Sequence, residues 1–149
     1  MFVSSYNLYR TPPVNPGANS VVQISSLDHL VLTVASIDAT VRFYTHILGM
    51  RAVHFGNGRT ALAFGDQRIN LHQRGAEYLP KALNPTPGSA DLCFLTATPL
   101  TDVMMHCMAQ SVKIEQGPIR RTGAIGPINS IYLRDPDGNL IEISNQIES

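Results

Sequence analysis

The sequence predicts an α+β fold in which two βαβββ modules follow one another along the chain. The order strand, helix, three strands occurs twice, and a stretch rich in Pro and Gly at 73–88 separates the two copies. An alternating α/β fold would need a helix after every strand, and the later strands of each copy have none. The length of 149 residues suits one domain built from two halves.

The first module is predicted to begin with a strand over 27–34, which is rich in Val, Leu and Thr. Ser36 is the expected N-cap of a helix whose apolar residues recur at helical spacing, and Gly49 is expected to end that helix. Three short strands are predicted next, at 51–55, 60–64 and 68–72, with Gly-containing turns between them.

The second module is predicted to repeat this order with a strand over 91–96. Thr98 is the expected N-cap of the second helix, with Pro99 in its first turn. A short strand at 112–115 is followed by a predicted loop that runs to Pro127. A hairpin over 129–145 supplies the last two strands, with Asp135-Pro136-Asp137-Gly138 as its turn.

The N-terminal segment before the modules is predicted to be a lead-in to a single domain. The run 11–20 is dense in Pro, Gly and Asn, so we expect a flexible lead-in over 1–22. A single domain then occupies 23–149, with its modules at about 26–75 and 89–147. The first ten residues lack the pattern of a secretory signal, but their Arg and Ser content leaves organelle targeting open.

The balance of charge argues against nucleic-acid and membrane partners, and the cysteines indicate the redox compartment. Lys and Arg number 11, as do Asp and Glu, and the largest basic cluster is the pair Arg120-Arg121. Nucleic acid and acidic membranes are therefore not the expected partners, and no apolar run approaches the roughly 20 residues that span a bilayer. Cys93 and Cys107 lie in apolar segments and are expected to be buried free thiols, which indicates a reducing, cytoplasmic location.

Two residues with metal-binding side chains interrupt apolar strands at opposite ends of the domain. Glu142 lies in the last predicted strand and His29 in the first. A carboxylate in apolar surroundings is costly unless a cation compensates it, so the pair suggests a metal site that folding assembles. The alternatives are a core histidine at His29 and an ion pair of Glu142 with Arg121 or Arg134.

Several strings of residues resemble the vicinal oxygen chelate superfamily, which includes glyoxalase I, and within it the group of glyoxalase-domain-containing protein 5. They cover 26–147 and are Asp28-His29-Leu30, Phe43-Tyr44 with Leu48-Gly49-Met50, Gly65-Asp66-Gln67-Arg68-Ile69-Asn70-Leu71-His72, Gly88-Ser89 with Asp91, Arg121-Thr122-Gly123-Ala124, and Asp135-Pro136-Asp137-Gly138-Asn139-Leu140-Ile141-Glu142. The resemblance implies a cup-shaped, eight-stranded mixed sheet that encloses a divalent metal ion. It also implies metal ligands on the first and last strands of each module.

Carried over to this chain, the resemblance places metal ligands at His29 and Glu142. The two remaining positions depart from the family pattern, because Asn70 stands where relatives carry Glu or Gln and Asp91 where they carry His. His72 points to the same face of its strand as Asn70 and offers an imidazole in its place. Asp91 offers a carboxylate that suits Mn²⁺, Mg²⁺ or Fe²⁺. A strand-capping role for His72 and a turn-capping role for Asp91 are the alternatives.

The resemblance implies an enzyme that binds the oxygens of a small substrate to the ion. Zn, Ni, Mn, Mg and Fe all remain open as the metal. Glu142 or Asp91 is the expected general base of a lyase or isomerase reaction. Asn70, Arg121, Ser130 and Tyr132 are candidate substrate-binding residues, although packing or solvation also explains them. The other implied functions are an extradiol-type dioxygenase and a metal-free module that sequesters a small molecule, and a homodimer is expected from the family.

Overall fold

The computed structural model describes residues 21–148, and the first module has the predicted order of elements. Strand β1 (His29–Val34) is followed by helix α1 (Ile37–His46) and by strands β2 (Arg51–Phe55), β3 (Arg59–Phe64) and β4 (Gln67–Gln73). Ser36 caps α1 as predicted, since its hydroxyl accepts a hydrogen bond from the Ala39 amide at 3.2 Å. Gly49, with φ of +66°, follows the helix as its predicted stop.

The second module repeats this arrangement. Strand β5 (Asp91–Leu95) is followed by helix α2 (Leu100–Ala109) and by strands β6 (Ile114–Thr122), β7 (Pro127–Arg134) and β8 (Leu140–Gln146). The strand order is β1-β4-β3-β2 in one sheet and β5-β8-β7-β6 in the other, so the two sheets have the same topology. In each sheet the first strand runs parallel to the last, and the remaining pairs are antiparallel.

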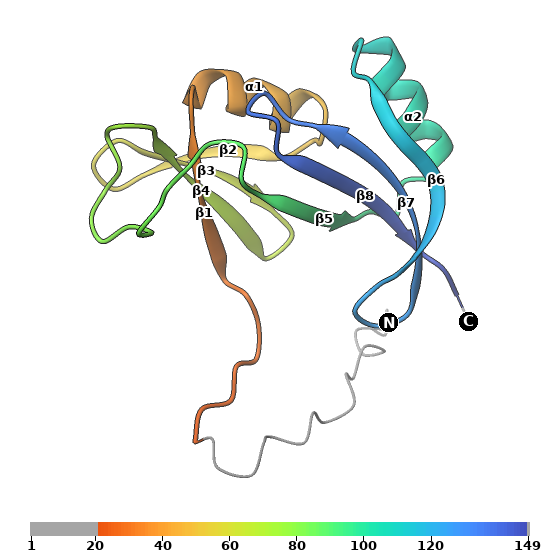
Figure 1. Cartoon of the computed structure of the whole chain (residues 1–149), viewed down its shortest axis with the longest axis horizontal. Helices are drawn as coiled ribbons and strands as arrows, with labels where there is room; N and C mark the ends of the chain where they lie inside the picture. Colours follow the sequence, from red (N-terminus) through yellow and green to blue (C-terminus); the bar gives the residue numbers. More distant parts are fainter. Residues whose placement is uncertain (1–20, 149) are drawn as a thin grey trace, which may run out of the picture.

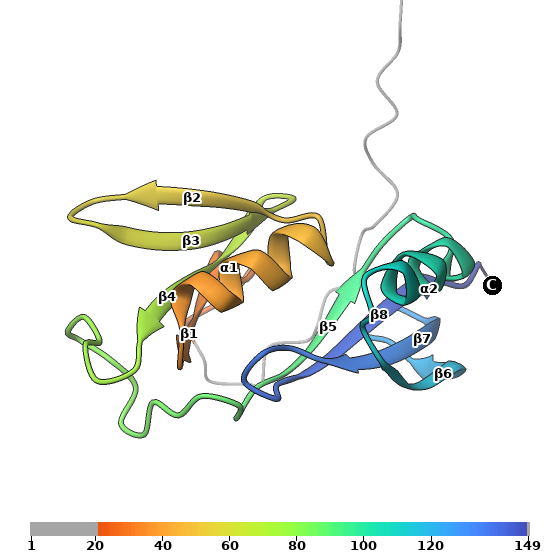
Figure 2. The same ribbon diagram turned by 90° about the horizontal axis from the view of Figure 1, so that it is seen from above.

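The predicted α+β fold of two βαβββ modules is confirmed. Within residues 21–148, eight strands are divided between two four-stranded mixed sheets. Figures 1 and 2 show the modules side by side, with the connector after β4 leading across to β5. Among residues 21–148, no helix is long and apolar enough to cross a membrane. The lead-in falls mostly on residues 1–20, outside the described part of the chain, and the domain boundary stays a prediction.

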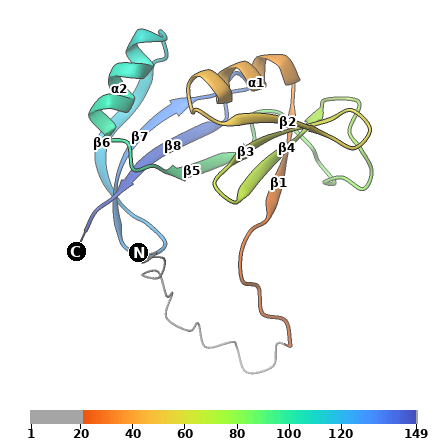
Figure 3. The same ribbon diagram turned by 180° about the vertical axis from the view of Figure 1, so that it is seen from behind.

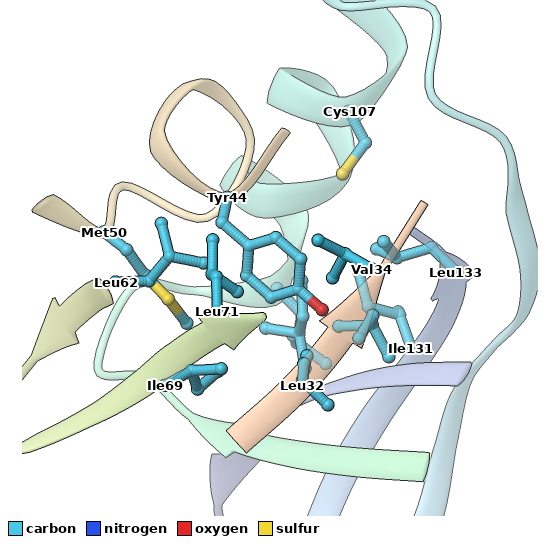
Figure 4. Packing of buried hydrophobic residues seen from close by; sticks show 13 residues of the cluster. Leu32, Val34, Tyr44, Met50, Leu62, Ile69, Leu71, Cys107, Ile131 and Leu133 are labelled. Atoms are coloured by element: carbon cyan, nitrogen blue, oxygen red, sulfur yellow. The ribbon is translucent and has the colours of Figure 1, made fainter. Parts of the chain in front are cut away.

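One hydrophobic core joins the two modules. It contains Leu32, Val34, Leu62 and Leu71 from the first module together with residues of the second, such as Ile131, Leu133 and Cys107. Figure 4 shows the ring of Tyr44 among side chains from both modules. The inner face of each sheet, on which its helix packs, is therefore also the face turned toward the other module.

A buried polar contact fixes the β7–β8 turn against α1. Asp135 accepts hydrogen bonds from the Tyr44 hydroxyl at 2.9 Å, from the Asn139 side-chain amide at 2.7 Å and from two backbone amides. Burial, with Asp135 beside it, raises the pKa of Tyr44 far above its usual range. The Asp-Pro-Asp-Gly turn therefore serves as a structural joint between the modules.

The structure corrects three predictions about the second module. Strand β6 extends to Thr122, whereas the sequence predicted a loop after 115. The strand tolerates Gly117 and Pro118 because register shifts relative to β7 accommodate them. Thr98 is not the cap of α2, because Pro99 occupies the N-cap position without a side-chain bond. Cys93 is exposed, while Cys107 is buried as predicted, and both thiols are free.

Candidate functional site

Each sheet has an open face on the side away from the core. Side chains alternate along a strand, so the residues between the core residues share the other face. On the first sheet this face carries His29, Val31, Asn70 and His72, and we call it the first open face. On the second sheet the equivalent face carries, through the register of its strands, Asp91, Cys93, Glu142, Ser144 and Tyr132, and we call it the second open face.

The two faces place the predicted ligand positions at equivalent points. Val31 pairs with Asn70 across the parallel strands of the first sheet, and Cys93 pairs with Glu142 across those of the second. His29 and Asp91 each lie two residues before that pair, on the edge strands β1 and β5. Asn70 is therefore the counterpart of Glu142, and His29 is the counterpart of Asp91.

Four predicted site residues lie together on the second open face. Asp91, Arg121, Tyr132 and Glu142 line one hollow of about 710 Å³. A neighbouring hollow of about 490 Å³ is lined by Arg121, Tyr132 and Glu142 and extends along Cys93 and Leu95. Both volumes lie in the range of small-molecule sites.

Glu142 has no cationic partner among the described residues. Arg121 instead donates from Nε to the Tyr132 hydroxyl at 3.0 Å, and Arg134 pairs with Glu115 at 3.2 Å. The Glu142 carboxylate accepts a hydrogen bond from the Ser144 hydroxyl at 3.4 Å and also interacts with the Cys93 thiol. A partly buried carboxylate with so little compensation is a site at which a cation would be stabilised.

Asp91 is exposed, and its carboxylate makes no hydrogen bond within residues 21–148. The turn before it is held by other groups, because Ser89 donates to the Thr86 carbonyl at 2.8 Å and Asn139 accepts from the Ala90 amide at 2.8 Å. Asp91 is thus not needed as a turn cap. Burial raises the pKa of Cys93, and the negative charges of Glu142 and Asp91 raise it further, while the hydrogen bond with Ser144 opposes this shift.

Ser130 lies beneath this hollow and is fully buried. Its hydroxyl is 2.8 Å from that of Ser144 and belongs to a short hydroxyl chain that leads to Glu142. The sequence predicted Ser130 as a substrate contact through strand alternation. In the structure its hydroxyl bonds to that of Ser144, and the substrate contact stays a prediction.

On the first open face, His29 lies at the start of β1 with its side chain 42% exposed. Its Nδ1 is 2.6 Å from the carboxylate of Asp28, and this bond lowers the pKa of Asp28. A carboxylate on Nδ1 leaves Nε2 free and orients the ring, which is the arrangement that metal-binding histidines commonly show. The sequence placed Asp28 in a family motif but did not reveal this role, because the pair depends on side-chain rotamers.

His72 is not among the residues that line the hollow of Asp91 and Glu142, which we call the acid-lined hollow. It lines a different cavity of about 420 Å³, beside the connector between the modules. Its ring stands edge to face with Tyr78 at 5.5 Å. Burial lowers the pKa of His72, and the positive charge of Arg59 lowers it further.

Asn70 carries a buried side-chain oxygen that has no hydrogen-bond partner in the described chain. Two arginines of the same sheet face, which the sequence did not single out, are nearby. Arg68 lies over the Phe55 ring at 4.5 Å and Arg59 over the Tyr78 ring at 4.6 Å, and neither forms a salt bridge among residues 21–148. Arg68 is near enough to Asp28 to help lower the pKa of that carboxyl. The first open face therefore carries two arginines beside an unsatisfied acceptor.

The structure thus divides the predicted site between two faces. Asp91, Glu142, Arg121 and Tyr132 come together on the second, while His29, Asn70 and His72 lie on the first. Within residues 21–148, no three His, Cys, Asp or Glu side chains are close enough to hold one metal ion. The donor types still fit a divalent cation, because the unpaired Glu142 and Asp91 supply oxygen and His29 supplies an oriented nitrogen.

Comparison with known proteins gives a consistent result. The family model for the Glyoxalase/Bleomycin resistance protein/Dioxygenase superfamily matches residues 26–143. The chain is 57% identical over 124 residues to virulence protein STM3117 of Salmonella typhimurium, covering 83% of this chain and 86% of that protein. It is 54% identical over 124 residues to glyoxalase domain-containing protein RDO1 of Mycosarcoma maydis, covering 83% of this chain and 70% of that protein.

Solved structures agree with these sequence matches. The crystal structure of STM3117 has a TM-score of 0.83 at 56% identity and covers 85% of this chain and 100% of its own. An integron cassette protein from the mobile metagenome of V. cholerae has a TM-score of 0.84 at 59% identity. That match covers 86% of this chain and 100% of the cassette protein.

Proposed function

The chain belongs to the Glyoxalase/Bleomycin resistance protein/Dioxygenase superfamily, and on this basis we propose that it is a metal-dependent lyase or isomerase. Its substrate is a small, oxygen-rich anion whose oxygens chelate a divalent cation. Within the superfamily we assign it to the group of glyoxalase-domain-containing protein 5, through the strings from Gly65 to His72 and from Arg121 to Ala124.

The observation that carries the proposal is the uncompensated acid pair Asp91 and Glu142 in one hollow. Neither carboxylate forms a salt bridge within residues 21–148, although Lys113, Arg121 and Arg134 line the same hollow, so a cation that joins the two carboxylates would stabilise them. Arg121 lies in the same hollow and makes no bond to either acid. It is therefore available to bind an anion beside the cation.

We further propose that the metal shell is shared between two copies of the chain. His29 and Asp91 lie on the edge strands of their sheets, and both edges carry exposed aliphatic side chains, with Val31 44% and Leu95 59% exposed. Pairing β1 of one copy with β5 of the other would cover these side chains. It would also bring His29 next to Asp91 and Glu142 of the second copy, in a homodimer with two equivalent sites.

The chemistry then follows from the groups in the hollow. A bound divalent cation supplies Lewis-acid polarisation of the substrate oxygens. Arg121 binds the negative charge of the substrate, while its Nε holds the Tyr132 hydroxyl in place. Glu142 or Asp91 would take or deliver a proton at the carbon next to a substrate carbonyl. The Ser130–Ser144 pair steadies one oxygen of Glu142.

Metal content is the first test of this function. Untagged protein purified without chelator should retain close to one divalent ion per chain, and Glu142→Gln should lose it. Asp91→Asn should lose most of the metal while His72→Ala keeps it, since His72 lies in a separate cavity. Full metal in Asp91→Asn with none in His72→Ala would reverse the assignment.

Binding of small oxyanions is the second test. Metal-loaded protein should melt at a higher temperature with a small 2-oxo acid or phosphonate, and Arg121→Ala should reduce this stabilisation by about 1–3 kcal/mol. Arg120→Ala is the matched control, because its exposed neighbouring side chain lies on the other face of β6. Equal stabilisation with and without metal would favour the second candidate function.

That second candidate is a metal-free module that binds a small molecule. The substitutions at Asn70 and Asp91 favour it, since they leave fewer strong ligands than the family pattern has. The cationic first open face, with Arg59 and Arg68 stacked on aromatic rings, would then be the binding surface. An extradiol-type dioxygenase would in addition require bound iron, which the same metal analysis would detect.

A further inference from the structure

A separate cavity lies between the connector and the first sheet. Its volume is about 420 Å³, and its floor includes Thr33 of β1 and His72 of β4, which are direct partners in the strand register. Connector residues from Pro80 to Ser89 form the opposite wall, and Asn139 of the β7–β8 turn contributes to the lining. Figure 3 shows this connector passing from β4 to β5.

The floor of this cavity holds two largely buried polar side chains that make no internal hydrogen bond. Thr33 and His72 are each only 9% exposed, and neither side chain bonds to another residue within the described chain. Their polar atoms open onto the cavity, because within residues 21–148 the one fully buried side-chain oxygen or nitrogen without a partner is Asn70 Oδ1. These atoms are therefore available to a molecule that enters the cavity. Both side chains face the same space, which a ligand with matching donors and acceptors would fill.

The charges of the lining define the kind of ligand. Lys81 is the one charged residue among those that line the cavity, and its ammonium is 3.0 Å from Glu77 outside the lining. Burial and the charge of Arg59 lower the pKa of His72, which favours the neutral imidazole with its one donor and one acceptor. The Thr33 hydroxyl also offers both, and Val31, Ala82 and Pro85 add an apolar wall.

We propose that this cavity is a ligand site for a small hydroxycarboxylate. Lys81 holds the carboxylate, Thr33 and His72 exchange hydrogen bonds with the hydroxyl, and the apolar wall contacts the carbon chain. This site goes beyond the proposed metal function. It shares no lining residue with the hollow of Asp91 and Glu142 and needs no metal ion.

The test is an NMR titration of isotope-labelled, full-length protein with lactate. Propane-1,2-diol is the matched probe, because it has the same carbon chain and hydroxyl but no carboxylate. Lactate should shift the signals of Thr33, His72, Lys81 and Ser89, and propane-1,2-diol should not. The titration is run on protein as purified and again after chelator treatment, and the shifts of these four cavity residues should be the same in both.

Variants separate a binding role from a structural one. Thr33→Val should weaken lactate binding about threefold to tenfold, and Lys81→Gln about tenfold or more. Because the Thr33 hydroxyl makes no internal hydrogen bond, Thr33→Val should melt at or above the wild-type temperature. Thr101→Val and Arg42→Gln, which remove a hydroxyl and a positive charge outside both hollows, should bind lactate like wild type.

Several outcomes would overturn the proposal. These are unchanged signals at the cavity, equal responses to lactate and the diol, wild-type affinity in both cavity variants, or shifts that vanish with chelator. The last result would place lactate in the acid-lined hollow of Asp91 and Glu142 instead. Lys81 is partly exposed and outside the core, so its variant keeps the test decisive even if Thr33→Val fails to fold.

Discussion

At the scale of single residues, partners distinguish the five histidines from one another. All five lie in the described part of the chain, and among them His29 alone contacts a carboxylate, whereas His46, His54 and His106 contact hydroxyl or carbonyl oxygens. The His72 side chain makes no hydrogen bond within residues 21–148. Histidine therefore has two roles on the first open face: His29 is an oriented candidate ligand at one end, and His72 lines a cavity at the other.

Removing the Asp28 carboxylate tests the oriented-ligand role of His29. Asp28→Asn should weaken metal binding about 10- to 100-fold, because the ring of His29 loses the acceptor that fixes its orientation and increases its basicity. Isothermal titration with Mn²⁺ or Zn²⁺ measures the effect. Asp66→Asn, at an exposed turn of the same module, should bind metal normally. Wild-type affinity in Asp28→Asn would mean that His29 is not a ligand.

His72 should make the stability of the protein depend on pH. Its pKa lies below the ordinary 6.5 because burial and Arg59 disfavour the imidazolium, despite an opposing effect of Glu77. Between the folded pKa and 6.5 the unfolded chain binds more protons, so stability is full above about pH 6.5 and falls as the pH drops across that window.

Replacement of His72 should flatten this dependence. In chelator-treated protein, His72→Gln should lose less of its melting temperature between pH 7.5 and pH 5 than wild type does. Thr33→Val changes the same cavity wall but removes no titrating group, so it should keep the wild-type slope. An unchanged slope in His72→Gln would show that other groups cause the pH dependence.

The sequence predicted the four residues of this hollow as site residues on separate grounds. Glu142 stood out in an apolar strand, Tyr132 followed from strand alternation, Asp91 from the family resemblance and Arg121 from a predicted loop, and the strand register brings them together. Sequence reasoning did not predict that they share a hollow apart from His29. It did not find Asp28, Thr33, Arg59 or Arg68 as site residues. Their roles depend on rotamers, on the unbonded state of a hydroxyl and on aromatic stacking, which residue spacing does not determine.

At the scale of elements, α2 begins in an unexpected way. Asn145 of β8 accepts from the Leu100 amide at 3.1 Å and donates to the carbonyls of Thr96 and Thr98 at 2.8 and 2.9 Å. One side chain thus caps the helix and ties it to the end of the last strand. A local pattern favoured Thr98, because the true cap comes from a residue 45 positions away.

Substitution of Asn145 and of Thr98 distinguishes a helix cap supplied by β8 from a local cap. Asn145→Ala should lower the free energy of unfolding by about 1–3 kcal/mol, because one cap and two carbonyl partners are lost. Thr98→Ala should change it by less than about 0.5 kcal/mol, as expected for a surface position. Urea denaturation measures both. Equal losses in the two variants would restore the local capping model.

Strand β6 shows why one element was mispredicted. Gly117 and Pro118 are typical of loops, yet the chain continues as a strand through them with irregular pairing to β7. Gly117 has φ of +107°, and a Cβ there would collide with the Ser130 carbonyl oxygen. Local composition predicts a break, whereas pairing with β7 maintains the strand. The other seven strands overlap their predicted ranges, because their turn signals coincide with real turns.

At the scale of the whole molecule, the two modules share one core, and their open faces lie outside it. The contact from Tyr44 to Asp135 spans 91 positions in the sequence and fixes this arrangement. The repeat of strands and helices predicted the modules but not how they pack, because no local pattern encodes contacts at such a distance. The expected single cup is therefore divided between two sheets in one chain.

Mixed dimers provide the decisive test of a metal site shared between copies. His29→Ala and Glu142→Ala should each lose metal when pure, since every site in either homodimer lacks one ligand. After subunit exchange of an equal mixture, about a quarter of the wild-type metal should return, because half of the dimers are mixed and each of these has one intact site. Metal analysis after removal of free ions measures the recovery.

The control mixture is His29→Ala with a double variant, His29→Ala/Glu142→Ala. Any pairing of these two proteins lacks His29 in every site, so no metal should return, although subunits exchange in the same way. If His29 and Glu142 of one chain served the same ion, mixing the two single variants would also restore nothing. Recovery in the first mixture and not in the second therefore requires that the two open faces meet between copies of the chain, with His29 contributed from one and Glu142 from the other.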